Sequence, residues 1–240
     1  MAVIEIHSNY IDLGINSRSI TDGDEYKMVS NFIEYRKESF KEKPDNHLAV
    51  FLETKINNAY PDVVFAEYNP FMYEEWNDAR NSLSLFDMKV LHYIYTCQNV
   101  TSSKIIKSLS YKYRDLLSAL EKLLDADLII RKNGKWAMQR KNVFGVKKVE
   151  AIEAKISNWD KVMQQALLNK TFASESCILS KKKTKPSSDI ISQMTDLGIG
   201  IYIYNDIDFL KISSAKKRKF PINYNSIYIN ECIGRVLHYN

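Results

Sequence analysis

The fold class is determined by residues 146–180, VKKVEAIEAKISNWDKVMQQALLNKTFASESCILS. The pattern predicts a strand over 146–156, a helix over 158–173 and a second strand over 175–181. Asp160 lies in the first turn of that helix, where a negative charge is favoured by the helix dipole. A strand, a helix and a strand in this order favour a right-handed crossover between parallel strands of one sheet.

The same alternation of helices and strands continues on both sides of this stretch. The predicted elements are helices at 24–40 and 187–198 and strands at 48–56, 62–68 and 200–205. Gly198 closes the helix that precedes the last strand, as glycine commonly does at a helix C-terminus. We therefore expect an α/β protein in which helices flank a sheet that is at least partly parallel.

The middle of the chain, residues 81–140, interrupts this pattern. Helices are expected at 83–97, 102–109 and 110–128, followed by two short strands joined at Asn133-Gly134, the sequence that best predicts a two-residue hairpin turn. The apolar positions expected to face a core are Leu85, Met88, Leu91, His92 and Tyr95 in the first helix and Leu116, Leu117, Leu120, Leu123 and Leu124 in the third. Three helices followed by a hairpin resemble a winged helix-turn-helix domain.

The resemblance to a winged helix implies DNA contacts from two places. In that family the third helix enters the major groove and the hairpin touches the backbone. The corresponding residues are Tyr111, Lys112, Tyr113 and Arg114 at the start of the helix and Arg131, Lys132 and Lys135 in the hairpin. Arg114 suits bidentate contact with a base, and the lysines suit phosphate contacts. A protein-interaction module with a solvated, lysine-rich face is the alternative.

Composition and charge exclude several protein classes. The chain has 240 residues and a net charge of +5, which equals the excess of ten basic over five acidic side chains in residues 81–140. No apolar run is long enough to span a membrane, and the first residues do not resemble a signal peptide, so a cytoplasmic protein is expected. The sequence lacks a Gly-rich phosphate loop, a Gly-x-Ser-x-Gly elbow and a Cys-x-x-Cys pair.

Glu153-Ala154-Lys155 carries the clearest chemical signal. Alternate residues of a strand point to the same side, so Glu153 and Lys155 are expected to project together. Metal-dependent hydrolysis of a phosphodiester uses this pair, because the carboxylate helps to hold Mg²⁺ or Mn²⁺ and the ammonium stabilises developing charge or positions the attacking water. Asp62, in the segment Tyr60-Pro61-Asp62, begins a predicted strand and would supply a second carboxylate.

These residues resemble the PD-(D/E)XK superfamily of restriction-endonuclease-like nucleases, and the strand, helix and strand after the motif are similar to the family core. The resemblance implies a mixed sheet flanked by helices, split into residues 1–80 and 141–240 by a winged helix at 81–140. It also implies the functional residues. Asp62 and Glu153 would bind the metal ion, Lys155 and Gln165 would complete the catalytic site, and Glu53 is a possible addition.

Two alternatives accompany this interpretation. Glu53-Thr54-Lys55 repeats the motif after Pro44-Asp45, but it is followed by a turn and a strand where the family requires a helix. Glu153 and Lys155 could also form a surface ion pair without function, worth under about 1 kcal/mol. The main hypothesis is a Mg²⁺-dependent DNA endonuclease, and the rival is a non-catalytic, DNA-binding regulatory protein with an inactive nuclease-like scaffold. Whether the protein acts as a homodimer stays open.

Overall fold

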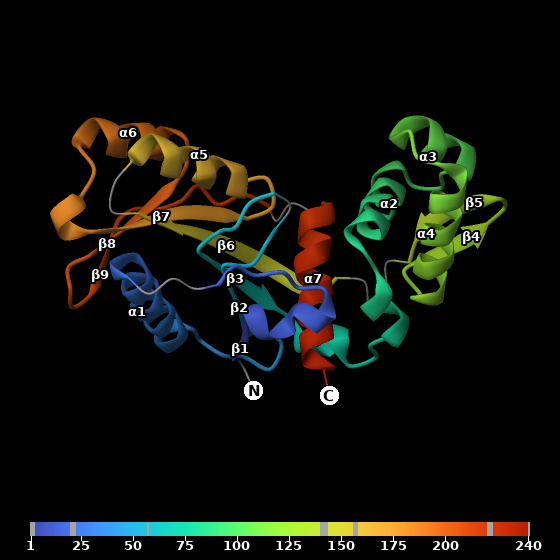
Figure 1. The fold of residues 1–240 in the computed structure, drawn as a ribbon, viewed down its shortest axis with the longest axis horizontal. Helices are drawn as coiled ribbons and strands as arrows, with labels where there is room; N and C mark the ends of the chain where they lie inside the picture. Colours follow the sequence, from blue (N-terminus) through green and yellow to red (C-terminus); the bar gives the residue numbers. More distant parts are fainter. Residues whose placement is uncertain are drawn as a thin grey trace. The chain divides into compact units, whose positions relative to one another are not determined.

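The computed structural model describes residues 3–19, 23–56, 58–139, 144–155, 158–219 and 223–239 (Figure 1). The chain divides into two compact units. The first unit comprises Met1–Asn69 and Val146–Pro221, and the second comprises Pro70–Gly145 and Ile222–Asn240. The predicted boundaries at residues 80 and 141 differ from this division, and residues 222–240, which were assigned to the split α/β domain, belong to the second unit.

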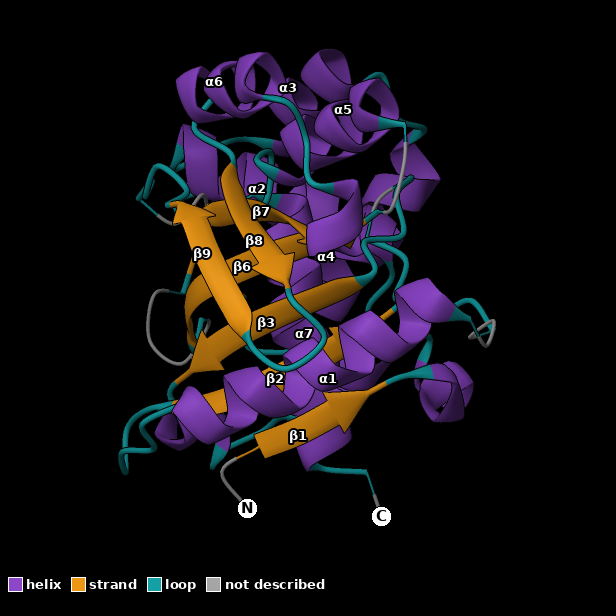
Figure 2. Ribbon diagram, turned by 90° about the vertical axis from the view of Figure 1, so that its left-hand side faces the viewer, coloured by secondary structure: helices purple, strands orange, loops and turns teal. Residues whose placement is uncertain are grey.

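The first unit contains a mixed sheet (Figure 2). The described strands are β1 (Val3–Ile6), β2 (His47–Leu52), β3 (Val63–Tyr68), β6 (Val146–Ala154), β7 (Glu175–Lys181), β8 (Gly200–Tyr204) and β9 (Phe209–Ser213). They lie in the order β1-β2-β3-β6-β7-β8-β9. β6, β7 and β8 are parallel, which confirms that the sheet is partly parallel, whereas β2, β3 and β6 are antiparallel neighbours.

Helices cover both faces of this sheet. α1 (Asp24–Ser39) lies on one face, and α5 (Trp159–Asn169) and α6 (Ser188–Asp196) lie on the other (Figure 1). Val63 and Ile152 are opposite each other in β3 and β6, and both pack in the core that includes α1. Because side chains alternate along a strand, the neighbouring positions 62 and 153 are directed toward the α5 face.

Some strands and helices of the first unit differ from the sequence prediction. β1 and β9 were not predicted, because each is a short edge strand. The strand predicted over 48–56 ends at Leu52, since Glu53 adopts a φ of 45°, outside the β region. The helix expected over 158–173 ends at Asn169. The remaining described elements are two short 3₁₀ helices, η1 (Ser8–Leu13) and η4 (Lys182–Thr184).

The second unit contains the predicted three helices and hairpin. Its elements are η2 (Pro70–Tyr73), η3 (Asp78–Ser82), α2 (Leu85–Cys97), α3 (Ser102–Leu109), α4 (Tyr113–Asp125), β4 (Ile129–Lys132), β5 (Lys135–Met138) and α7 (Tyr224–Leu237). Asn133 and Gly134 have φ values of 51° and 73°, the positive values expected for this hairpin turn. α7 was not predicted, and its Ile227 packs in the same core as α2 and α4.

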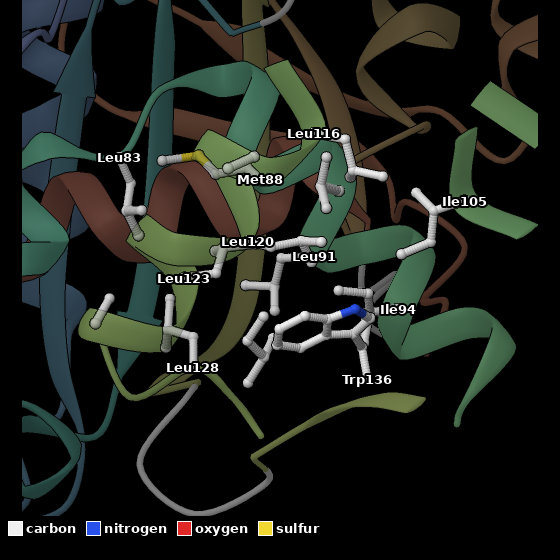
Figure 3. Close-up of a cluster of buried hydrophobic side chains, with 14 of the residues drawn as sticks. Leu83, Met88, Leu91, Ile94, Ile105, Leu116, Leu120, Leu123, Leu128 and Trp136 are labelled. Carbon is white, nitrogen blue, oxygen red and sulfur yellow. The ribbon is translucent and has the colours of Figure 1, made fainter. Parts of the chain in front are cut away.

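Leucines of α4 show which face of the helix is buried (Figure 3). Leu116, Leu120 and Leu123 are at most 1% exposed, whereas Leu117 and Leu124 are 36% and 43% exposed. The prediction that all five face the core was therefore wrong, because a helix with 3.6 residues per turn places 117 and 124 beside the buried stripe. In α2, Met88 and Leu91 are buried as expected. Val90 and Ile94 complete its buried face, while Leu85, His92 and Tyr95 are only partly buried.

A buried ion pair joins α7 to η3. Arg80 donates from Nε to Glu231 Oε2 at 2.9 Å and from Nη2 to Glu231 Oε1 at 2.6 Å. Both side chains are at most 5% exposed, and the Arg80 guanidinium also lies 4.1 Å from the centroid of the Trp76 ring. This pair links η3 and α7 within the second unit. Within the described residues, no helix is long and apolar enough to cross a membrane.

Leu120→Ala is expected to lower the free energy of unfolding by about 2–5 kcal/mol, because it leaves a cavity in the core of the second unit. The matched variant Leu117→Ala, on the exposed side of the same helix, is expected to cost less than about 1 kcal/mol. Urea denaturation followed by far-UV circular dichroism measures both. Equal losses would contradict the burial pattern of α4.

Candidate active site

Strand pairing brings three carboxylate-bearing residues together at one end of the neighbouring strands β2, β3 and β6. Leu52 is opposite Val63 in the antiparallel pair β2–β3, so Glu53 and Asp62 are neighbours, and the Glu53 N–H donates to the Asp62 carbonyl at 3.1 Å. Val63 is opposite Ile152 in the pair β3–β6, which places Asp62 beside Glu153. The Asp62 side chain accepts a hydrogen bond from the Ala154 N–H at 2.5 Å.

A cleft of about 320 Å³ opens at this end of the three strands. The predicted residues Asp62, Lys155, Gln165 and Glu53 all line it. The fourth member of the predicted catalytic set, Glu153, is not among the lining residues. Its side chain is buried, and its Oε1 accepts a hydrogen bond of 2.7 Å from Asn169 Nδ2.

Lys155 is held by a residue that the sequence motif did not include. Its Nζ donates to Glu25 Oε2 at 3.1 Å, and Glu25 lies in the first turn of α1. Burial lowers the pKa of Lys155, but the hydrogen bond to Glu25 and the charge of Asp62 outweigh burial and raise it overall. The ammonium group therefore stays charged at neutral pH, and both Lys155 and Glu25 line the cleft described above.

The carboxyl groups in the site bind protons more tightly than ordinary carboxyl groups. Burial, followed by the nearby charge of Asp62, raises the pKa of Glu53 to about 7. Burial and the charge of Asp62 likewise raise the pKa of Glu153 to about 8. Burial also raises the pKa of Asp62, against the opposing effect of the Ala154 amide. A cation that replaced these protons would relieve the repulsion between the carboxylates.

The residues of the site also include buried oxygen atoms without a hydrogen-bond partner. These are Gln165 Oε1 and Asn169 Oδ1, one turn apart on α5, and no described residue donates to either. Amide and carboxylate oxygens suit a hard cation, and Mg²⁺ is usually held by one or two carboxylates together with water. No cluster of three or more His, Cys, Asp or Glu side chains suited to a metal exists in the described part of the chain. The oxygen donors that the site could offer a divalent ion are thus the carboxylates of Asp62 and Glu153, together with these two amide oxygens.

The second occurrence of the motif does not form a site. Asp45 precedes β2 and is paired with Lys147 at 2.9 Å, whereas Glu53 follows the opposite end of β2. The side chain of Lys55 is exposed. Pro44-Asp45 and Glu53-Thr54-Lys55 are thus separated by the length of a strand, although Glu53 itself lies in the cleft.

The predicted DNA-binding residues lie in two groups on the second unit. Lys112, Tyr113 and Arg114 are exposed at the N-terminal end of α4. Tyr111 is only half-exposed, because its ring packs on Phe86 with the centroids 4.5 Å apart. The hairpin residues Arg131, Lys132 and Lys135 are all exposed, and the guanidinium of Arg131 lies 5.3 Å from the centroid of the Trp136 ring.

Several residues of the site were missed by the sequence interpretation. Asn169 is four residues after Gln165, so helical spacing could have placed both on one face. Glu25 looks like an ordinary acidic residue in a first helical turn, and nothing in the sequence connects it with Lys155. Arg18 and Tyr60 also line the cleft, but no motif includes them.

Comparison with known proteins supplies no relative. No protein-family model matches the chain, and no match was found among the curated proteins or the solved structures. The function is therefore inferred from the residues and geometry of the cleft.

Glu153→Gln is expected to stabilise the metal-free protein at alkaline pH, by roughly 5 °C in melting temperature. The pKa of Glu153 rises from 4.5 to about 8 on folding, so the folded state keeps a proton that the unfolded chain releases. Stability is therefore lost as the pH rises through that interval, and glutamine, which cannot ionise, removes the loss. Thermal melts in EDTA across the same interval measure the effect.

The matched control is Glu38→Gln, an exposed position on α1. Adding Mg²⁺ is expected to raise the melting temperature of the wild type more than that of Glu153→Gln, because a ligand stabilises the state that binds it. Identical pH profiles and identical responses to Mg²⁺ in wild type and variant would contradict the assigned role of Glu153.

Proposed function

We propose that this protein is a Mg²⁺- or Mn²⁺-dependent DNA endonuclease with a restriction-endonuclease-like first unit. The observation that carries the proposal is the meeting of Asp62, Glu153 and Lys155 at the ends of adjacent antiparallel strands, beside a cleft. The order of elements supports it too, because β6 is followed by α5 and the parallel strand β7, as the resemblance implies.

Each residue of the cleft has a chemical role in this proposal. Asp62 and Glu153 would hold the divalent ion. When bound, that ion supplies charge neutralisation at the scissile phosphate and a more acidic water molecule. The Lys155 ammonium donates hydrogen bonds to the attacking water or to a phosphate oxygen, and Glu25 fixes its direction. Gln165 Oε1 is an acceptor that orients water within the cleft.

The second unit is proposed to be a winged helix that binds DNA. Its three helices and hairpin share one core, and its exposed basic residues gather at the start of α4 and on the hairpin. Lysine and arginine side chains in such positions neutralise phosphates and release counterions. This role does not require catalysis, so it is common to the endonuclease and to the non-catalytic rival.

Asp62→Asn and Lys155→Ala are each expected to lower Mg²⁺-dependent cleavage of DNA by about 100-fold or more. Asparagine keeps an acceptor for the Ala154 N–H but removes the charge that would hold the ion. The assay incubates plasmid, linear duplex and single-stranded DNA with Mg²⁺ or Mn²⁺.

Lys41→Ala is the matched control for Lys155→Ala. Lys41 is exposed and follows the C-terminal end of α1, whereas Glu25 lies at its N-terminal end, so about 20 Å of helix separates them. Equal cleavage by the wild type and both site variants would refute the assignment of the site. Absence of cleavage by the wild type, together with firm DNA binding, would favour the non-catalytic rival.

The double variant Lys112→Glu with Arg114→Glu is expected to weaken binding to a short duplex by about tenfold or more, because two phosphate or base contacts become repulsive. The control, Lys41→Glu with Lys43→Glu, makes the same change in net charge on the first unit. Electrophoretic mobility shift measures both in Ca²⁺. A shift that is unchanged in the first variant, or equally weakened in the two, would refute DNA contact through α4.

A further inference from the structure

One wall of the cleft is formed by a stacked pair, Arg18 and Tyr60. The Arg18 guanidinium carbon lies 3.9 Å from the centroid of the Tyr60 ring. The Arg18 side chain is exposed, and it forms no ion pair with a carboxylate among the described residues. Both residues line the cleft that contains Asp62, two positions after Tyr60 in the chain.

Backbone pairing fixes the position of Arg18 next to the carboxylates. The Arg18 N–H donates to the Glu53 carbonyl at 3.0 Å, and the Lys55 N–H donates to the Asn16 carbonyl at 2.7 Å. Between them, the hydroxyl groups of Ser17 and Thr54 are 3.0 Å apart. The segment that carries Arg18 is therefore held against the residues that follow β2, and the stacked pair is part of the site rather than a free surface arginine.

The acidic side chains that line the cleft oppose the entry of a polyanion, so its cationic side chains are needed for binding. The carboxylates of Glu25, Glu53 and Asp62 would repel a polyanion, and Lys155 is engaged by Glu25. Arg18 and Lys161 are the other cationic residues that line the cleft, and both are exposed. A nucleic-acid strand that reaches Asp62 must be attracted by these two side chains.

The shape of the pair indicates which part of a nucleic acid it contacts. Lys161 offers a point charge suited to a phosphate, whereas a guanidinium on a tyrosine ring offers a flat, cationic surface. Bases stack on aromatic rings and on guanidinium planes, but only when they are not already stacked inside a duplex. The surface therefore suits an unpaired nucleotide.

We propose that Arg18 and Tyr60 form a stacking subsite for an unpaired nucleobase beside the phosphodiester bound at Asp62. The inference rests on the proposed nuclease function and deepens it, because it names the substrate class. The site takes single-stranded DNA, or DNA with a frayed or flipped nucleotide, in preference to a continuous duplex.

Binding of fluorescein-labelled single-stranded and blunt-ended duplex DNA of one sequence tests this proposal. Fluorescence anisotropy is recorded in Ca²⁺ for Arg18→Lys, which keeps the charge but loses the planar group, and for Tyr60→Leu, which loses the ring. Each variant is expected to bind single-stranded DNA about tenfold more weakly, with a much smaller change for duplex. Tyr60→Phe, which keeps the ring, is expected to bind both as the wild type does.

Lys211→Ala is the matched control. Its Nζ lies 5.1 Å from the centroid of the Tyr202 ring, so it removes another cation–aromatic contact of the first unit, and neither residue lines the cleft. It is expected to leave both affinities unchanged. Circular dichroism melts of every variant identify loss of folding, and Tyr60→Phe separates loss of the ring from loss of the hydroxyl group.

The outcomes separate this proposal from the function on which it rests. If the wild type cleaves DNA but Arg18→Lys and Tyr60→Leu bind single-stranded DNA normally, the stacking subsite is refuted and the nuclease assignment stands. If both variants lose the same factor on single-stranded and duplex DNA, the pair contributes only charge, and the substrate class is refuted. If the wild type neither binds nor cleaves DNA, both proposals fail.

Discussion

Burial of neighbouring carboxyl groups at the ends of β2, β3 and β6, together with the repulsion between them, is the constraint on which the site of the first unit depends. Antiparallel pairing places the backbones of Glu53, Asp62 and Glu153 next to one another. The surrounding groups act against that repulsion. Asn169 and the Ala154 amide donate hydrogen bonds to two of the carboxylates, and Lys155 contributes a positive charge. A cluster of charged groups that lowers the stability of the fold is typical of a functional site.

The two faces of the sheet have separate tasks in this arrangement. Apolar residues of α1 pack on one face and provide much of the core, while the first turn of α1 supplies Glu25 to Lys155. α5 covers the other face and brings Gln165 and Asn169 to the carboxylates. The helices that carry these polar groups are also packed on the sheet, which holds the polar groups in place. A functional site needs its side chains to be held in this way.

The sequence predicted the parts of the fold whose signals are local. Hydrophobic spacing located α1 to α6 and the parallel strands β6, β7 and β8, and Asn133-Gly134 located the hairpin. Asp62 could be connected with Glu153 and Lys155 only through a family resemblance, because its proximity to them depends on strand pairing across about 90 residues. Arg18, Tyr60 and Glu25 were out of reach, since their partners are set by tertiary contacts. No sequence pattern indicated β1, β9 or α7. Residues 222–240 were therefore assigned to the α/β domain, although they belong to the second unit.

The route of the chain has a consequence for how the molecule can be made and divided. The chain passes between the units at residues 69–70, 145–146 and 221–222, so neither unit is one continuous piece. During synthesis, α2 to α4 leave the ribosome long before α7, and until then Arg80 lacks the carboxylate of Glu231. A fragment of residues 70–145 would lack the carboxylate that pairs with Arg80 in the complete chain. The second unit is thus completed last, after the sheet of the first unit has been synthesised.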